Sequence, residues 1–357
     1  MKKQNLIVYS GRGSSHSWTW LADMFEARGV HNVRFLGSED FIKAVESEPT
    51  IVVISGGDGF AIADALSGLG FHNLRNYVQK GGTYIGICAG AYLPLPSSIP
   101  PFSEFNLSST KVENIDCTLS PLEGIPPRIA VKYGHCAIVH PIRGEVEFEY
   151  RHFRYVAPVY GGPVFREPVD DDVLMRYRAF TPNTEFQILK HMASGLVLDR
   201  PAAVRATFGT GTLFLFGPHL EHPRYSKANR LFFEIIGLHG HRWKPPPFKQ
   251  KTTESLAKAL ADLKVAILGL ENRSFVVGKK LWDGGRYMDL TNAIAKRVCA
   301  LDDAAQAETA SALLKVRDAL VGTSVGTETD VDEATDLLVQ TARACVDRYF
   351  LAMADGR

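Results

Sequence analysis

Short apolar runs alternate with helical stretches along the first part of the chain. Four runs rich in β-branched residues predict strands, at Leu6–Tyr9, Val33–Leu36, Ile51–Ile54 and Tyr84–Ile87. Between the first two runs, apolar residues recur at helical spacing from Trp18 to Phe25. Strands that are apolar throughout are buried on both faces, so the pattern predicts an α/β fold whose parallel sheet carries helices on both faces. In such sheets the functional groups gather at the carboxyl ends of the strands.

The pattern changes between about Lys111 and Arg205, where Gly and Pro become frequent. Short mixed strands are expected there, at Ile129–Tyr133, Val146–Tyr150, Val173–Tyr177 and Phe186–Leu189. We interpret them as an antiparallel elaboration of the first domain. A hairpin, Val204–Phe208 with Leu213–Phe216, and a helix over Arg224–Ile236 are expected to complete a domain of residues 1–243.

Three consecutive prolines at 245–247 predict a stiff linker over residues 244–251. Beyond it the sequence is rich in Ala and Leu and carries no strong strand signal. Apolar residues at spacings of three and four predict a small bundle of about four helices over residues 252–357. The last helix is expected to begin at Asp330, with Glu333 in the reciprocal capping position. Such a linker predicts that residues 1–243 fold without the bundle.

Charge and cysteine usage limit the classes of protein that the chain can represent. Forty Lys and Arg residues against thirty-nine Asp and Glu leave a formal charge of +1, so no excess cation favours a nucleic-acid or membrane-surface partner. The five cysteines are widely spaced and form no Cys-x-x-Cys pair, which is typical of reduced thiols. The first apolar run is too short for a signal peptide, and no run suggests a membrane span. A cytoplasmic protein is expected.

The most informative segment is Gly86-Ile87-Cys88-Ala89-Gly90, in which an apolar strand runs directly into Gly-x-Cys-x-Gly. This pattern is typical of a nucleophile elbow, the sharp strand-to-helix turn that exposes a nucleophile. A helix N-terminus behind the cysteine would also favour the thiolate. The alternative is a buried, inert cysteine. The flanking glycines favour the nucleophile, because they permit the close backbone contacts of the turn.

A cysteine nucleophile needs a base and a group that orients the base. His219 and Glu221 follow a late predicted strand, and residues two apart in an extended segment point the same way. The alternative for His219 is a surface histidine. The Gly56-Gly57 pair also follows a strand, and its backbone N–H groups, with that of Ala89, are candidates for an oxyanion hole.

Two pairs of possible ligands could suggest a metal site: His135 with Cys136, and His239 with His241. Neither has the four-ligand spacing of a zinc site, so no metal is expected.

These motifs resemble the class I glutamine amidotransferase-like superfamily. The resemblance rests on Gly86 to Tyr92, on Gly56-Gly57 and on Gly217-Pro218-His219-Leu220-Glu221. Val8-Tyr9-Ser10-Gly11 and Tyr160-Gly161-Gly162-Pro163 are similar to the amino-terminal domain of eukaryotic biotin-protein ligases and its stand-alone microbial relatives. The likeness spans about residues 5–240 and leaves the helical tail outside it.

The resemblance implies a flavodoxin-like core in which Cys88, His219 and Glu221 form a catalytic triad. The candidate substrate-binding residues within the similar motifs are Tyr92, Tyr160, Gly161 and Gly162. Two positions depart from the superfamily pattern: Leu220 replaces a common Pro, and Asp58 follows the Gly pair. Both departures concern the substrate pocket and leave the triad intact.

The sequence therefore predicts a Cys-dependent amidohydrolase that cleaves a small-molecule or peptide amide through a thioester, without a cofactor or metal. The alternative is a non-catalytic ligand-binding or regulatory module that keeps this fold. In both cases the helical tail could bind a protein partner.

Overall fold

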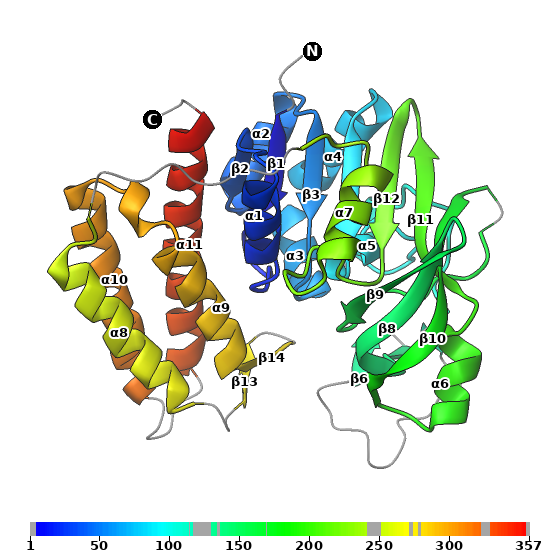
Figure 1. Ribbon diagram of the computed structural model, residues 1–357. Coiled ribbons are helices and arrows are strands. Elements are labelled where there is room, and N and C mark those ends of the chain that lie inside the picture. The colour runs from blue at the N-terminus through cyan, green and yellow to red at the C-terminus, as the bar shows by residue number, and fades with distance from the viewer. Residues whose placement is uncertain are drawn as a thin grey trace.

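The computed structural model describes residues 5–113, 115–116, 130–133, 136–168, 170–240, 251–270, 274–277, 280–322 and 329–354. Ile129, His135, His241 and the expected linker up to residue 250 lie outside these ranges. Figure 1 shows a large sheet with covering helices beside a group of C-terminal helices. Among the described helices, none combines the length and apolar character needed to cross a bilayer.

One half of the nine-stranded sheet is parallel. Its strands, in spatial order, are β2 (Val33–Leu36), β1 (Leu6–Tyr9), β3 (Ile51–Ile54), β4 (Thr83–Ile87) and β12 (Gly211–Phe216). All four expected N-terminal strands are present, and β4 begins one residue earlier than expected. Alternate residues of these strands belong to two separate cores: Leu6 and Val8 pack on one side of the sheet, and Ile7 and Tyr9 on the other. The prediction of an α/β fold with a sheet covered on both faces is confirmed.

The other half of the sheet is antiparallel and continues from β12. Its strands are β11 (Pro201–Phe208), β10 (Asp172–Phe186), β8 (Ile142–Tyr150) and β9 (Phe153–Val159). The prediction of a separate strand over Phe186–Leu189 is wrong, because Phe186 is the last residue of β10. Strand β9 was not expected, since Pro158 interrupts its apolar residues and proline is confined to edge strands such as this one. A separate small sheet contains β5 (Ile115–Asp116), β7 (Cys136–Val139) and β6 (Ala130–Tyr133).

Helices cover the two faces of the large sheet. The helices of the N-terminal part are α1 (Trp18–Ala27), α2 (Ser38–Glu46), α3 (Gly59–Leu66), α4 (Leu69–Gln79), α5 (Ala89–Tyr92), α6 (Lys190–Val197) and α7 (Ser226–Ile235). A 3₁₀ turn, Phe102–Glu104, follows α5. Helices α1 and α7 contribute to one core, whereas α2, α3 and α4 contribute to the other. The parallel half of the sheet therefore lies between two layers of helices.

The C-terminal part contains helices α8 (Glu254–Leu268), α9 (Gly284–Ala295), α10 (Asp303–Gly322) and α11 (Thr329–Ala354), with a 3₁₀ turn at Val298–Ala300. The prediction of a C-terminal helical region is confirmed. In addition, a hairpin of β13 (Ser274–Val277) and β14 (Lys280–Asp283) that was not predicted lies between α8 and α9. Two four-residue strands are too short to produce a distinct periodic signal.

Helix α11 packs against the edge strand β2 (Figure 1). Phe350 contacts Phe35 with ring centroids 5.1 Å apart. Asp347 accepts hydrogen bonds from the Arg34 guanidinium and, at 2.8 Å, from the Phe35 backbone N–H. The Phe35 N–H lies on the edge strand, where it could otherwise pair with another strand, and the Asp347 carboxylate occupies it. The C-terminal helices thus cover one edge of the sheet.

Candidate functional site

Cys88 occupies a strained turn between β4 and α5. Its φ of 52° and ψ of −110° lie in a region that non-glycine residues rarely adopt. A Cβ at Gly86 would lie 2.5 Å from the carbonyl oxygen of Gly90, and one at Gly90 only 1.9 Å from that of Ile54. The two glycines therefore allow the backbone contacts that hold Cys88 in this conformation.

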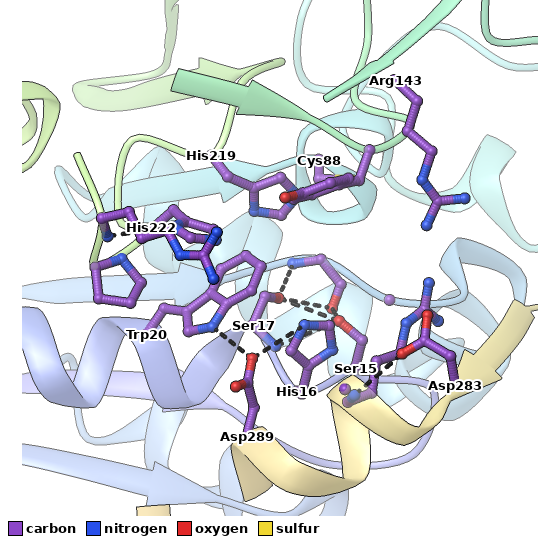
Figure 2. A pocket seen from close by; sticks show the side chains of 17 residues that line it. Ser15, His16, Ser17, Trp20, Cys88, Arg143, His219, His222, Asp283 and Asp289 are labelled. Carbon is purple, nitrogen blue, oxygen red and sulfur yellow. Dashed lines mark hydrogen bonds and ion pairs between the residues drawn. The ribbon is translucent and has the colours of Figure 1, made fainter. Parts of the chain in front are cut away.

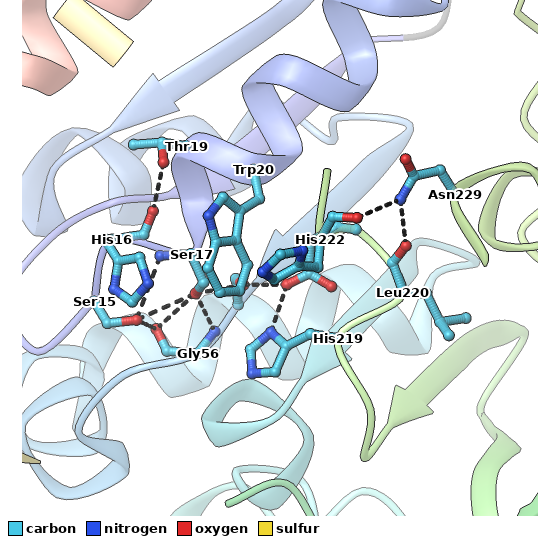
Figure 3. A network of polar contacts seen from close by, with 12 residues as sticks. Ser15, His16, Ser17, Thr19, Trp20, Gly56, His219, Leu220, His222 and Asn229 are labelled. Atoms are coloured by element: carbon cyan, nitrogen blue, oxygen red, sulfur yellow. Dashed lines mark hydrogen bonds and ion pairs between the residues drawn. The ribbon is translucent and has the colours of Figure 1, made fainter. Parts of the chain in front are cut away.

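His219 links Cys88 to a buried carboxylate. It follows β12, and its backbone N–H donates to Pro158 O at 2.8 Å. Its Nδ1 lies 2.7 Å from Oε1 of Glu221, and its ring also forms a hydrogen bond with Cys88. Ser55 Oγ donates to the same Glu221 oxygen at 3.2 Å. Figure 3 shows the polar network around His219 and Ser17.

The electrostatics of this group favour a charged imidazole. Burial alone would lower the pKa of His219, but the Glu221 carboxylate and the Cys88 sulfur outweigh that effect and raise the pKa to about 10. His219 is 3% exposed and Glu221 is 0% exposed. The second Glu221 oxygen is buried without a hydrogen-bond partner, so the ion pair with His219 is the main compensation for burying this carboxylate.

The expected helix behind Cys88 is present but short. Helix α5 has four residues, so a helix dipole contributes little at Cys88. The group that can stabilise a thiolate here is the protonated His219.

The Gly-rich loop after β3 lies against the histidine ring. A Cβ at Gly56 would be 2.9 Å from His219 Cε1. The Gly56 N–H donates to Ser17 Oγ at 3.1 Å, so it is already occupied and cannot also bind an oxyanion. Of the three predicted oxyanion donors, the N–H groups of Gly57 and Ala89 remain candidates. The Asp58 side chain accepts from the N–H groups of Phe60 and Ala61 and thereby caps α3. The departure of Asp58 from the superfamily pattern therefore has a structural role.

A cavity of about 390 Å³ opens beside Cys88 and His219 (Figure 2). Its lining residues are Ser15, His16, Ser17, Trp20, Gly56, Gly57, Cys88, Arg143, Tyr160, His219, His222, Pro223, Arg224, Asp283, Gly285, Arg286 and Asp289. The volume lies in the range of small-molecule sites.

Of the four candidate substrate-binding residues, Tyr160 lines the cavity, with its ring 5.6 Å from that of His219. Tyr92 packs instead against the core that contains α3 and α4. Gly162 supports the backbone, since a Cβ there would lie 1.9 Å from Gly217 O. Gly161 adopts a φ of 131°, which favours glycine at this turn.

Several cavity residues were not anticipated from the sequence. The Trp20 ring lies 5.5 Å from that of His219 and 4.4 Å from that of His222. Burial lowers the pKa of His222 to about 4 and that of His16 well below its usual value. These two rings are therefore neutral near pH 7 and differ in charge from His219. Their helical or loop positions carry no motif that the sequence could have shown.

One wall of the cavity comes from the C-terminal part. Trp20 Nε1 donates to Asp289 Oδ2 at 3.1 Å, which joins α1 to α9. Asp283, Gly285 and Arg286 line the cavity from β14 and the start of α9. In Figure 2, Asp283 and Asp289 lie across the cavity from Cys88 and His219. The C-terminal part is thus a component of the site and not only an appendage.

The comparisons with known proteins match the N-terminal part of the chain. Residues 4–99 match the family model described as "Biotin-protein ligase, N terminal". This range includes Cys88 and the Gly56-Gly57 pair, and it is shorter than the resemblance expected over residues 5–240. A protein of Chlamydia muridarum (strain MoPn / Nigg), described as uncharacterized, is 36% identical over 98 residues. The match covers 26% of this chain and 38% of that relative.

Two solved structures share weak similarity with the chain. A glutamine amidotransferase is 18% identical, with a TM-score of 0.40 over 65% of this chain and 99% of that one. A GH42 beta-galactosidase from G. stearothermophilus is 13% identical, with a TM-score of 0.39 over 66% of this chain and 30% of that one.

Proposed function

We propose that the protein is a Cys-dependent amidohydrolase. His219 takes the proton of the Cys88 thiol, and the thiolate attacks the carbonyl carbon of an amide. The Gly57 and Ala89 N–H groups stabilise the oxyanion. The tetrahedral intermediate then expels the amine, which takes its proton from His219, and leaves a thioester on Cys88. Water, deprotonated by His219, attacks the thioester and releases the acid and the free thiol.

The observation that carries this proposal is the buried contact series from Glu221 through His219 to Cys88. An ordinary core would fill this space with apolar side chains, because burying an ion pair costs desolvation free energy. The strained backbone of Cys88 supports the same conclusion, since such strain clusters at functional positions. The steps use protein groups and water, and a reduced Cys88 agrees with the cytoplasmic location expected from the sequence.

Acylation by p-nitrophenyl acetate tests the proposal directly. We expect a burst of p-nitrophenolate equal to the enzyme concentration, and an acetyl group on Cys88 in mass-spectrometric peptide maps. Cys88→Ser should abolish the burst, whereas Cys299→Ser, at a partly exposed thiol away from the cavity, should retain it. His219→Ala should slow acylation by on the order of 100-fold.

Two outcomes would contradict the proposal: an acetyl group distributed evenly over the cysteines, or acylation of Cys88 that is unaffected by His219→Ala. In either case the alternative of a ligand-binding module would be favoured.

A further inference from the structure

Three arginines line the cavity around Cys88. Arg143 comes from β8, Arg224 follows His222, and Arg286 lies in the first turn of α9. Within the described ranges, no carboxylate oxygen lies within the 4.0 Å ion-pair limit of any of these guanidinium groups. Three guanidinium groups therefore share the cavity with two carboxylates, and none of the three is in ion-pair contact with a described carboxylate.

The acidic residues of the cavity have other partners. Asp289 accepts from Trp20 and lies 3.7 Å from His16 Nε2. Asp283 accepts from the Arg286 backbone N–H at 3.2 Å and so caps α9. Neither carboxylate neutralises an arginine side chain at close range.

Arg143 and Arg286 are close enough to repel each other. Burial lowers the pKa of Arg286, and the charge of Arg143 lowers it further, against the opposing effect of Asp283. Glu185 is the register partner of Arg143 in the β8–β10 ladder, but no ion pair joins the two side chains. Two like charges facing one small cavity are stabilised by a bound anion.

Resting on the proposed function, in which Cys88 attacks the substrate, we propose that Arg286 and Arg143 bind an anionic group of that substrate. The substrate is then a small amide that carries an anionic group, a carboxylate or a phosphate, close to its scissile carbonyl. Since Arg286 belongs to the C-terminal part, that part determines the substrate class. The contact of Trp20 with Asp289 positions α9 for this role.

Alkylation of Cys88 by two reagents of similar size tests this inference. Iodoacetate is anionic and iodoacetamide is neutral, so the ratio of their rates measures attraction of the anion. Any change in the amount of thiolate affects both rates equally and cancels in the ratio. We expect Arg286→Gln and Arg143→Gln each to lower the ratio by about tenfold, the effect of losing one charge-assisted hydrogen bond.

Two further variants control for indirect effects. Arg286→Lys keeps the charge and should retain most of the ratio. Arg230→Gln, on the exposed side of α7 and outside the cavity, should leave the ratio unchanged. Protection experiments distinguish the two sources of the anion: stronger protection of Cys88 by succinate indicates a carboxylate, and stronger protection by phosphate indicates a phosphoryl group.

The outcomes separate this inference from the proposed function. An unchanged ratio in both Gln variants, or protection by neither anion, would overturn the inference while rapid alkylation of Cys88 by iodoacetamide leaves the amidohydrolase proposal standing. Alkylation of Cys88 no faster than that of the buried Cys345 would overturn both.

Discussion

Glu221→Gln replaces a buried carboxylate beside His219 with a neutral amide of nearly the same shape. In the wild-type protein the Glu221 Oε1 atom lies 2.7 Å from His219 Nδ1. The amide oxygen can still accept from this nitrogen, so the change removes charge and preserves the hydrogen bond. We expect the pKa of His219 to fall, because burial of the ring then acts without the opposing effect of the Glu221 carboxylate.

The size of the effect follows from the pKa of His219. The difference between about 10 and 6.5 corresponds to roughly 5 kcal/mol of preference for the charged ring, supplied by Glu221 and Cys88 together. Because the folded-state pKa is raised, this stabilisation is fully present below about pH 6.5 and is lost as the pH rises toward about 10. In that window the free energy of unfolding should fall by about 1.4 kcal/mol per pH unit for each extra proton bound by the folded state.

Urea unfolding measures this slope if Cys88 is first replaced. A native thiolate releases a proton and would cancel the proton that His219 takes up, so the comparison uses Cys88→Ser as the background. Without the sulfur's contribution the window ends below about pH 10. Cys88→Ser should lose stability across the window, whereas adding Glu221→Gln should remove the His219 part of that slope. Near pH 6.5 the free energy of unfolding of the double variant should be about 3 kcal/mol lower than that of Cys88→Ser alone.

Glu234→Gln in the same background is the matched control. Glu234 forms an ion pair with Arg151 at 3.2 Å, but both side chains are more than half exposed, at 53% and 71%. We expect this variant to change stability by less than about 1 kcal/mol, with no change in the pH slope. Identical slopes with and without Glu221 would refute the reasoning, since His219 would then be neutral in the folded protein.

Two further variants test the packing of the site. Gly56→Ala places a Cβ 2.9 Å from His219 Cε1, so alkylation of Cys88 by iodoacetamide should slow by about tenfold or more. Gly59→Ala is the control, because its Cβ meets nothing within 4 Å and should leave the rate unchanged. Equal rates in the two variants would show that the loop moves to accommodate the Gly56→Ala methyl group. Arg297→Met removes a buried guanidinium that pairs with Asp23 and Glu26 of α1, and urea unfolding should show a loss of about 3–5 kcal/mol. A loss below about 1 kcal/mol would show that these ion pairs do not hold the segment after α9 against α1.

The parallel half of the sheet was predictable because its strands are buried on both faces. Ile51 to Ile54 are apolar without interruption, and each of these residues is almost fully buried. The elbow was predictable for a different reason. Its glycines are required by contacts within a few residues of the turn or on the adjacent strand, so the local sequence records the constraint.

The antiparallel strands and the cavity wall were less predictable. Strand β9 contains Pro158, and a proline within an apolar run argues against a strand unless the strand lies at a sheet edge, as this one does. Arg286 lies almost two hundred residues beyond Cys88, on a helix whose own periodicity indicates only packing. Its place in the cavity depends on how α9 and the turn after it meet α1, through the Trp20–Asp289 hydrogen bond and the ion pair of the buried Arg297. Such contacts between distant segments leave no spacing that a single sequence can display.

The stability cost of a site is one way to distinguish the proposed catalytic site from the alternative, a binding module with the same fold. Glu221 is fully buried with one oxygen lacking a hydrogen-bond partner, and Cys88 holds a φ of 52°. Each feature lowers stability by on the order of 1–3 kcal/mol compared with an apolar, relaxed alternative. Arg143 and Arg286 add repulsion at the same cavity. A binding module would need the arginines, but it has no use for a charged histidine held between a buried carboxylate and a strained cysteine. The combination is what the proposed amidohydrolase requires of this cavity: a group that activates the thiol and, in the further inference, charges that bind an anionic substrate.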